Sequence, residues 1–274
     1  MGERQSRTAV EALLARHHLR PRRRLGQHFL VDPNLIDKTV RLAELGEGSR
    51  VLEVGTGTGS LTLALAEAGA SVLSYEVDGS LRPLLDEVLA DIDRVEVRFE
   101  DALAADLPSQ LEGKGWVMVA NLPFNIGTPL LMQLLVEAPQ LQRFVVMVQQ
   151  EVADRILARP GTKQYGLPTV LTRLHGSPRL AFRVPPQVFL PPPKVQSAVI
   201  VIERKPAHPL AGEALALASR AFGQRRKMLR GSLAGVLVEG ERSLLRAGLD
   251  PTDRPEALEP DAFLRLAAAC ADAA

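Results

Sequence analysis

Residues 51–60 read Val-Leu-Glu-Val-Gly-Thr-Gly-Thr-Gly-Ser, and this stretch decides the fold. The apolar run 51–54 predicts a short buried strand, and the glycines at alternate positions after it form a turn that opens a helix at Ser60. Their spacing is G-x-G-x-G, whereas the dinucleotide fingerprint requires G-x-G-x-x-G. Helix amides at such a turn favour an anionic or carboxylate group. The stretch therefore predicts a small-ligand site where this strand ends.

Strands and helices alternate onward from this turn. Upstream, Asp32 followed by Pro33 predicts the N-cap and first turn of a helix that stops at Gly46. The expected strands are 51–54, 70–75, 95–99, 116–120 and 144–148, and the expected helices between them are 60–67, 79–89 and 129–137. This rhythm predicts a mainly parallel sheet with helices on both faces.

The rhythm changes after residue 149. We expect helices over 149–158 and 167–174, then strands over 179–184 and 198–203 that could close the edge of the sheet as an antiparallel pair. Beyond Pro206 only helical patterns remain, over 209–222, 227–238, 241–247 and 261–269. The chain is thus expected to divide into an α/β domain, residues 1–206, and a small all-α domain, residues 207–274.

The composition is that of a folded protein, with 46% hydrophobic and 24% charged residues, which excludes extensive disorder. No apolar run reaches the roughly 20 residues that span a bilayer, and the arginine-rich N-terminus lacks an apolar signal core. We therefore expect a cytoplasmic protein with no membrane partner. The single cysteine, Cys270, excludes an internal disulfide, and we expect no metal site.

Positive charge is concentrated in two segments, although the net charge is only +1. In residues 1–30 the basic residues are Arg4, Arg7, Arg16, Arg20, Arg22, Arg23 and Arg24, against two acids; in residues 219–230 they are Arg220, Arg225, Arg226, Lys227 and Arg230, against none. Two basic segments on an otherwise acidic chain indicate a polyanionic partner. Either segment alone would more simply be a solvated helix face.

Acidic residues follow the second and third expected strands. Glu76 ends the second strand, where a carboxylate can accept hydrogen bonds from both ribose hydroxyls of a nucleoside. Asp101 follows the third strand and could accept a hydrogen bond from an adenine amine. Singly, each is more often a surface acid or a helix cap. In series with Gly55 and Gly57, they predict a nucleoside pocket at the carboxyl edge of the sheet.

The fourth expected strand ends in Asn121-Leu122-Pro123-Phe124. An adenine amine is a poor nucleophile because its lone pair is delocalised into the ring. The side-chain oxygen of Asn121 and the carbonyl of Leu122, exposed because Pro123 bends the chain, could hold its hydrogens and direct the lone pair at a sulfonium methyl. Phe124 offers a stacking face, worth about 1–3 kcal/mol in single-strand binders. The simpler alternative is an Asn-Pro turn with a core phenylalanine.

A target base must leave its stack to reach such a site. Phe189 is a candidate for the second side of a base clamp, because it lies in a loop that three consecutive prolines hold stiff. Packing of Phe189 in the core is an equally good interpretation.

Together these motifs resemble the ribosomal RNA small-subunit adenine dimethyltransferases of the KsgA/RsmA type. The resemblance extends from Leu25 to about Leu266. Its matching segments are 26–30, 53–59, 75–78, 101–103, 121–126, 149–155, 165–166, 189–197, 221–222 and 224–227. It implies a Rossmann-like class I methyltransferase domain, with a mainly parallel seven-stranded sheet, and a small helical C-terminal domain.

The resemblance also implies a cofactor, S-adenosyl-L-methionine. Its site would be lined by His28, Leu30, Gly55, Gly57, Glu76, Asp101 and Asn121, and the reacting loop would be 121–124. The chain departs from the commoner family residues at three positions. His28 stands where Asn is usual and still offers one hydrogen bond, Thr56 stands where Pro is frequent, and Phe124 replaces a common Tyr, which keeps stacking and loses a phenol hydrogen bond.

The implied substrate is a pair of adjacent adenosines in the 3′-terminal hairpin of 16S rRNA, each dimethylated at its exocyclic N6 amine. The family also acts late in small-subunit assembly, so we expect a monomeric enzyme whose partner is 16S rRNA within the immature small subunit. Phosphates of the RNA would be held by Arg22, Arg23, Arg225, Arg226 and Lys227.

Three alternatives remain open from the sequence. A methyltransferase of the erythromycin-resistance type would modify an adenine of large-subunit rRNA with the same motifs, but the match at 224–227 favours the small subunit. An RNA-binding assembly factor with incidental catalysis belongs to a different class. A DNA adenine methyltransferase is weaker still, because no helix-turn-helix reader is apparent.

Overall fold

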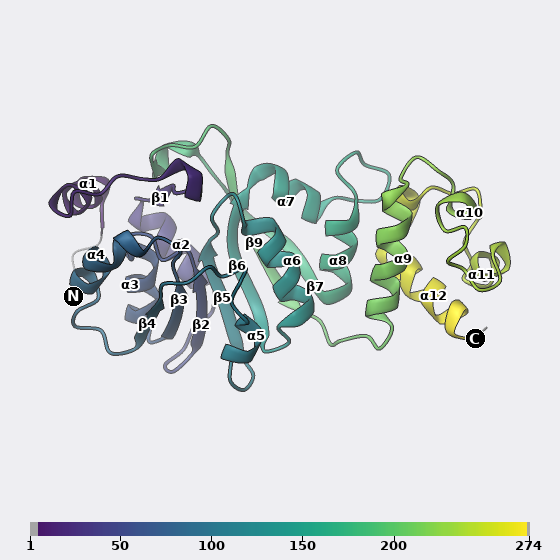
Figure 1. Ribbon diagram of the computed structural model, residues 1–274, viewed down its shortest axis with the longest axis horizontal. Coiled ribbons are helices and arrows are strands. Elements are labelled where there is room, and N and C mark those ends of the chain that lie inside the picture. Colours follow the sequence, from purple (N-terminus) through teal and green to yellow (C-terminus); the bar gives the residue numbers. More distant parts are fainter. Residues whose placement is uncertain (1–4, 273–274) are drawn as a thin grey trace. The chain divides into compact units, whose positions relative to one another are not determined.

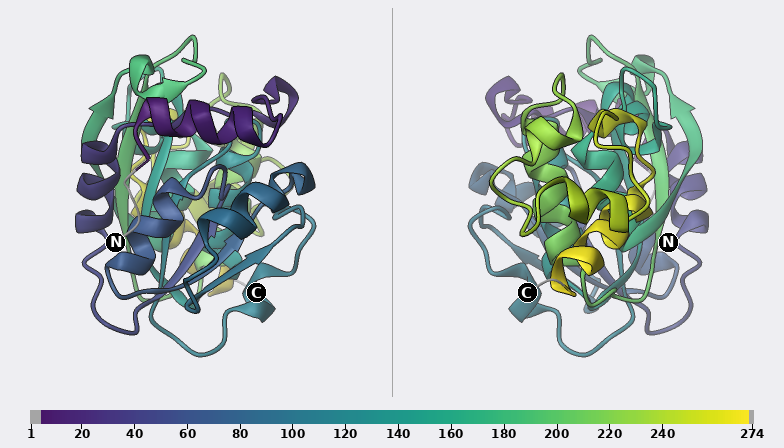
Figure 2. Two further views of the ribbon diagram at one scale, coloured as in Figure 1. Left: turned by 90° about the vertical axis from the view of Figure 1, so that its left-hand side faces the viewer. Right: turned by 90° about the vertical axis from the view of Figure 1, so that its right-hand side faces the viewer.

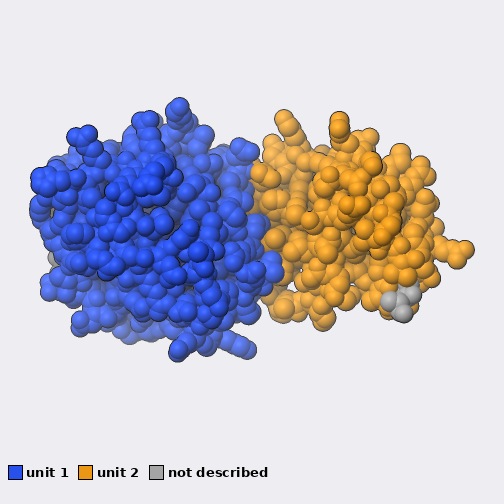
Figure 3. Space-filling view, in the orientation of Figure 1, with its two compact units in different colours: residues 1–153, 179–204 blue, residues 154–178, 205–274 orange. Residues whose placement is uncertain are grey.

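The computed structural model describes residues 5–272, which form two compact units (Figure 3). Unit 1 comprises residues 1–153 and 179–204, and unit 2 comprises residues 154–178 and 205–274. The expected boundary at residues 206 and 207 therefore misses one segment. Residues 154–178 group with the C-terminal helices, because helix α8 (Leu167–His175) packs against α9 (Ala211–Gly223) and α12 (Pro260–Ala271). Arg4 of the first basic segment lies outside the described residues.

Unit 1 is built on a seven-stranded sheet with the order β4-β3-β2-β5-β6-β9-β7 (Figure 1). Its strands are β2 Arg50–Val54, β3 Ser71–Tyr75, β4 Val95–Arg98, β5 Trp116–Asn121, β6 Leu141–Gln149, β7 Gly176–Val184 and β9 Ser197–Arg204. Strands β4 to β6 pair in parallel across the sheet, and β9 pairs antiparallel with β6. The mainly parallel α/β class predicted from the sequence is confirmed.

The helices of unit 1 are α1 Arg7–Arg16, α2 Pro33–Leu42, α3 Ser60–Glu67, α4 Arg82–Val88, α5 Leu107–Gln110, α6 Gly127–Glu137 and α7 Gln150–Leu157, the last of which runs on into unit 2. The helices expected after Asp32 and over 60–67, 79–89, 129–137 and 149–158 appear in that order, whereas α5 was not expected. Asp32 caps α2 as expected, because its carboxylate accepts hydrogen bonds from the backbone N–H groups of Asn34 and Leu35.

Alternate residues of the central strands bury opposite faces of the sheet. Val51, Val119 and Val145 pack in a core with side chains of α2 and α3. The intervening Leu52 and Met118, which point to the other face, are fully buried as well. Burial on both faces is the pattern of a parallel sheet between two layers of helices. It places the carboxyl ends of β2, β3, β4 and β5 side by side at one edge.

Two short strands were not expected from the sequence. β1, Phe29–Leu30, pairs antiparallel with β8, Phe189–Leu190, so that Leu30 lies opposite Phe189. Two residues are too few to show the alternation by which a strand is recognised. The pair matters because it joins the N-terminal segment to the proline-rich loop.

Unit 2 is helical. It contains α8 Leu167–His175, α9 Ala211–Gly223, α10 Leu229–Ser232, α11 Glu241–Arg246 and α12 Pro260–Ala271 around a core that includes Tyr165 and Phe263. The helix expected over 227–238 is wrong for most of its length. Only the four residues of α10 are helical there, and Gly235 has a φ of +76°, which interrupts a right-handed helix. Within residues 5–272 no helix is both long and apolar enough to cross a membrane.

Candidate active site

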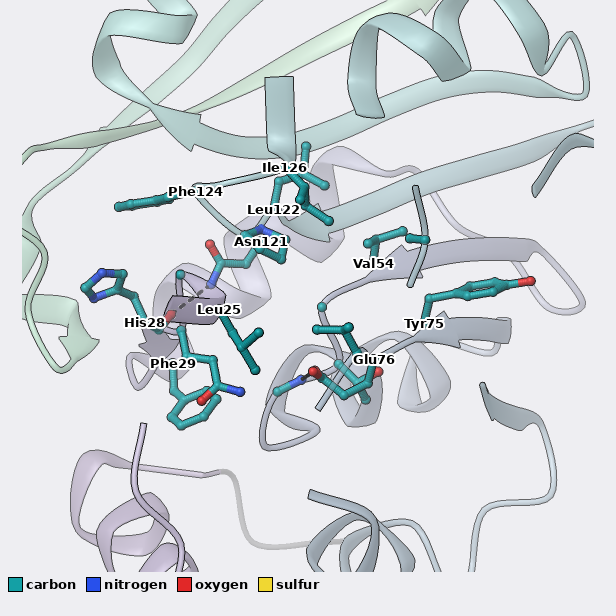
Figure 4. A pocket seen from close by; sticks show the side chains of 18 of the residues that line it. Leu25, His28, Phe29, Val54, Tyr75, Glu76, Asn121, Leu122, Phe124 and Ile126 are labelled. Carbon is teal, nitrogen blue, oxygen red and sulfur yellow. Dashed lines mark hydrogen bonds between the residues drawn. The ribbon is translucent and has the colours of Figure 1, made fainter. Parts of the chain in front are cut away.

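A pocket opens in unit 1 where the carboxyl ends of β2, β3, β4 and β5 meet (Figure 4). The residues that line it lie in five segments: 25–30, 54–61 without Gly59, 75–77, 100–102 and 121–126. Residues predicted for the cofactor or the reaction and found in its lining are His28, Leu30, Gly55, Gly57, Glu76, Asp101, Asn121, Leu122, Pro123 and Phe124. The fold therefore brings together residues that the sequence places almost a hundred positions apart.

The glycine turn needs glycine for steric reasons. Gly55, Gly57 and Gly59 have φ values of +88°, +57° and +80°. A Cβ on Gly55 would lie 3.2 Å from the ring of Pro123, and one on Gly57 would lie 3.1 Å from Phe29. Both neighbours line the pocket, so the turn is packed between the reacting loop and the N-terminal segment. Side chains at these positions would fill the space that a ligand needs.

Glu76 sits at the end of β3 with its carboxylate fixed. Its side chain accepts hydrogen bonds from the backbone N–H groups of Gly57 at 2.9 Å and of Asp78 at 2.8 Å. Only 5% of the residue is exposed, and this burial raises the pKa of the carboxyl group, against the two amides that lower it. Each oxygen keeps a second lone pair, so the group can still accept hydrogen bonds from a ligand.

The amide of Asn121 is held in one orientation. Its Nδ2 donates a hydrogen bond of 3.2 Å to the backbone carbonyl of His28 (Figure 4). A carbonyl only accepts, so the nitrogen must face His28 and the oxygen must be the other atom. The Asn121 side chain therefore keeps its acceptor for a ligand. The backbone supports the same loop, because Leu122 N–H donates to the carbonyl of Met147 on β6.

His28 and Phe124 lie beside each other at the rim of the site. Their ring centroids are 5.1 Å apart with an interplanar angle of 34°, and both residues are half-buried. The His28 Nδ1 lies 2.7 Å from the carbonyl oxygen of Pro191. Since that oxygen only accepts, Nδ1 carries a proton, and neutral His28 presents Nε2 as an acceptor. Phe124 keeps a partly open ring, as the stacking hypothesis requires.

Phe189 does not stand beside the pocket as a base clamp. Its side chain is fully buried in the core of unit 1 with Leu30 and Val199. A ring enclosed on all sides has no face for a nucleobase, so the clamp interpretation is a mistaken one and core packing is what the structure shows. The proline-rich loop therefore holds the short strand β8, and it does not present the ring of Phe189 to the pocket.

The basic residues expected to hold RNA differ in how free they are. Arg225 in unit 2 pairs with Glu256 at 2.7 Å and donates to the carbonyls of Thr162 and Lys163. Arg226 and Lys227, next in the chain, are exposed. In unit 1, Arg22 pairs with the buried Asp78 at 2.7 Å, whereas Arg23 is exposed. The guanidinium groups of Arg225 and Arg22 are thus already paired with groups of the protein, whereas the side chains of Arg226, Arg23 and Lys227 are exposed.

Several residues around the pocket were not predicted as site residues. Asp78 accepts hydrogen bonds from Arg22 and Gln27 and so fastens the N-terminal segment beside Glu76. Asp78 lies in the segment Tyr75-Glu76-Val77-Asp78, which resembles the family, but the sequence predicts a function only for Glu76 in this segment. Gln5 reaches the glycine turn from outside the pocket. No local pattern marks a glutamine 53 residues from its partner.

The chain is similar to known proteins over nearly its whole length. The family model of the ribosomal RNA adenine dimethylases, described as "Ribosomal RNA adenine dimethylase", matches residues 18–272. Ribosomal RNA small subunit methyltransferase A of Nocardia farcinica is 43% identical over 276 residues, 94% of this chain and 93% of its own. The protein of the same name from Streptococcus pneumoniae is 38% identical, with 95% of both chains covered.

Two solved structures are similar over most of the chain. A dimethyladenosine transferase from Plasmodium falciparum aligns with a TM-score of 0.72 and 26% identity, covering 87% of this chain and 96% of its own. The 23S rRNA methyltransferase ErmE aligns with a TM-score of 0.69 and 27% identity, covering 89% and 99%. The family match spans both units and the pocket. The chain belongs to the ribosomal RNA adenine dimethylase family.

Proposed function

We propose that this protein dimethylates the N6 amines of two adjacent adenosines in the 3′-terminal hairpin of 16S rRNA, with S-adenosyl-L-methionine as methyl donor. The observation that carries the chemistry is the fixed amide of Asn121, whose oxygen is left to accept hydrogens at the edge of a nucleoside-sized pocket. The choice of 16S rRNA rests on relatives named as small-subunit methyltransferases.

The pocket fits the cofactor by its chemistry. The glycine turn leaves open the space that Cβ atoms would fill, and it leads into the N-terminus of α3, which suits a carboxylate. The Glu76 carboxylate can accept from ribose hydroxyls, and Asp101 lines the part that would take the adenine. When bound, S-adenosyl-L-methionine supplies a methyl group already activated by its sulfonium, so the protein has mainly to position the acceptor.

The reacting loop performs that positioning. The Asn121 oxygen and the Leu122 carbonyl accept the two hydrogens of the adenine amine, which favours a pyramidal nitrogen whose lone pair faces the methyl group. Phe124 supports the base by stacking. Each transfer would form one nitrogen–carbon bond while the sulfur–methyl bond of the sulfonium breaks to leave a neutral thioether, and one proton of the amine would pass to solvent. The second transfer begins with a single N–H, so one of the two acceptors is enough to orient it.

Exposed basic residues of both units would bind the phosphates of the RNA. Arg23 in unit 1 and Arg226 and Lys227 in unit 2 are free to meet phosphates. We further infer that the protein acts as a monomer on a partly assembled small subunit in the cytoplasm.

The decisive experiment is transfer of labelled methyl groups to unmethylated small subunits, followed by nucleoside analysis. We expect N6,N6-dimethyladenosine, up to two per particle. The similarity to ErmE makes the large-subunit reaction the rival function. Primer extension on both rRNAs distinguishes the two. Modification of 23S rRNA alone would contradict the proposal.

A further inference from the structure

The start of α1 lies against two walls of the cofactor pocket at once. Gln5 is only 8% exposed and bonds to residues of the glycine turn. Arg7 donates to the carbonyls of Gln187 and Phe189, in the loop that carries β8. Both residues precede residue 18, where the match to the family model begins. No sequence motif predicts a function for Gln5 or Arg7.

Gln5 closes a ring of hydrogen bonds with Thr58 and Ser60. Its Nε2 donates to the Thr58 carbonyl at 2.9 Å, and its Oε1 accepts from the Ser60 hydroxyl at 2.6 Å. The Ser60 hydroxyl in turn lies 3.1 Å from the Thr58 hydroxyl. Because Ser60 donates its one hydroxyl hydrogen to Gln5, the Thr58 hydroxyl must donate to the Ser60 oxygen. Linked bonds of this kind polarise and strengthen one another.

The ring fixes a segment that would otherwise be loose. Gly57 and Gly59 give the turn more backbone freedom than any other residue type would, and ordering it costs free energy when a ligand binds. Glu76, just beyond the end of β3, holds the turn through the Gly57 N–H, and Gln5 holds it independently through the Thr58 carbonyl. Thr58 and Ser60 themselves line the pocket.

Arg7 connects the same segment to the other wall. Its guanidinium bonds lie at 2.6 Å from the Gln187 carbonyl and 2.9 Å from that of Phe189. Phe189 pairs with Leu30, and the nearby Pro191 carbonyl holds the His28 ring. Leu30 and His28 both line the pocket. In Figure 2 the purple helix α1 lies next to the green loop that carries β8.

The segment rests on a rigid base. Val10, Leu13 and Leu14 of α1 are buried against Leu84 and Leu85 of α4. At the other end of α1, His17 lies 2.7 Å from Glu87. A helix packed in this way can hold its first turn in place, so Gln5 and Arg7 act from a fixed support.

We propose that Gln5 and Arg7 are positioning residues that clamp the glycine turn against the β1–β8 wall and so set the affinity for S-adenosyl-L-methionine. This inference rests on the proposed use of the pocket for that cofactor. The clamp touches neither the Asn121 amide nor Leu122, which are held by His28 and Met147. Loss of the clamp should therefore weaken cofactor binding and leave the affinity for RNA intact.

The test uses full-length Gln5→Ala and Gln5→Glu variants, with Thr8→Ala as the control at an exposed position in the first turn of α1, three residues further along the chain. Gln5→Glu keeps the acceptor for Ser60 and loses the donor to Thr58. Calorimetry should show the Kd for S-adenosyl-L-methionine rising about tenfold in both Gln5 variants, the effect of one to two hydrogen bonds. The KM for small subunits and the Kd of Thr8→Ala should stay unchanged.

A second readout follows from the reciprocity of coupled sites. If the clamp stabilises the bound turn, the cofactor must slow hydrogen exchange of the α1 amides, and Gln5→Ala must abolish that protection. An unchanged Kd in the Gln5 variants, an equal rise in Thr8→Ala, or absence of protection in the unaltered chain overturns the clamp. Failure of the proposed function looks different: the cofactor binds with the expected Gln5 dependence, but no methyl group reaches 16S rRNA.

Discussion

At the residue scale, Asn121 combines a structural and a chemical task in one amide. Its nitrogen is committed to the His28 carbonyl, which leaves only the oxygen for the substrate amine. We expect Asn121→Ala to lower the rate of methyl transfer about a hundredfold, as loss of one preorganised polar group does in other enzymes. The measurement is single-turnover transfer at saturating cofactor and subunits. A variant that has lost methyl transfer but binds subunits normally and restores growth fully would instead favour an assembly factor with incidental catalysis, and an unchanged rate would contradict the role of Asn121.

Phe124 offers a matched pair of substitutions at the same site. The ring is half-buried beside His28, so it can stack on a base without leaving its place. Phe124→Ala should lower kcat/KM for RNA about 10- to 100-fold, the range of base–aromatic stacking energies. Phe124→Tyr keeps the ring and should retain activity. Equal losses in the two variants would mean that the ring packs the loop and does not meet the base.

Glu53 gives unit 1 a pH dependence. Its carboxylate is buried, accepts hydrogen bonds from Thr62 and Ser74, and has a pKa raised by burial from 4.5 to about 8. Between these two pH values the folded state therefore binds a proton that the unfolded chain has released. The stability that this proton contributes is fully present below the pKa of the unfolded state, and it is lost as the pH rises through the pKa of the folded state. The slope from one such group is at most about 1.4 kcal/mol per pH unit.

Glu53→Gln tests this dependence, because the amide keeps an acceptor for both hydroxyls and cannot ionise. Urea midpoints should fall with pH between the two pKa values in the unaltered chain and stay nearly level in the variant. Trp116, the single tryptophan, lies in β5 and reports on unit 1. Parallel curves for the two proteins would exclude Glu53 as the source of the slope.

At the scale of elements, Arg204 at the end of β9 holds the C-terminus of α6. Its guanidinium donates to the carbonyls of Leu134, Leu135, Ala138 and Leu141. The last carbonyls of a helix have no partner within the helix, so a buried cation there replaces several missing bonds at once. Since α6 begins directly after the reacting loop, this contact also anchors the loop from behind.

We expect Arg204→Met to lower the free energy of unfolding of unit 1 by about 2–3 kcal/mol, because the half-buried carbonyls lose their donor. Arg94→Met is the control, since the side chain of Arg94 forms an exposed ion pair with Glu47. Such pairs contribute about 0–1 kcal/mol. Urea unfolding followed by Trp116 fluorescence measures both. A similar small loss in the two variants would show that water replaces Arg204.

Helices and strands with a clear hydrophobic periodicity were predictable from the sequence, and short or interrupted ones were not. The helix at 60–67 and the strands at 71–75 and 116–121 lie where apolar spacing and glycines put them. The pair β1–β8 depends on a partner 160 positions away in sequence, and two residues carry no period. Over 227–238 the apolar residues had helical spacing, but a left-handed Gly235 breaks the helix into turns.

The candidate site shows the same division. Gly55, Glu76, Asp101 and Asn121 could be predicted because each lies at or just beyond the carboxyl end of a strand, and the carboxyl ends of parallel strands share one edge. Phe189 was ambiguous, since the sequence does not say which way a side chain in an isolated loop points. Gln5 was not recognisable at all, because its contacts are a product of the tertiary fold.

At the scale of the whole molecule, charge is the property that the pocket does not explain. In the basic run of unit 2, Arg225 forms an ion pair with Glu256 and hydrogen bonds with two backbone carbonyls. The next two residues, Arg226 and Lys227, are exposed. Adjacent residues of like charge therefore have different tasks. Arg225 joins the loop at 162–163 to the residues around Glu256, and the other two face solvent.

This difference predicts how RNA affinity responds to salt. Each phosphate contact removed should reduce the slope of log K against log salt concentration by roughly 1. Arg226→Ala with Lys227→Ala should therefore reduce the slope for small-subunit binding by about 2. Arg225→Ala should leave the slope unchanged and lower the thermal stability of unit 2, because it removes an internal anchor. Filter binding at several salt concentrations and calorimetric unfolding separate the two effects. A reduced slope in Arg225→Ala would mean that this guanidinium leaves Glu256 to meet the RNA.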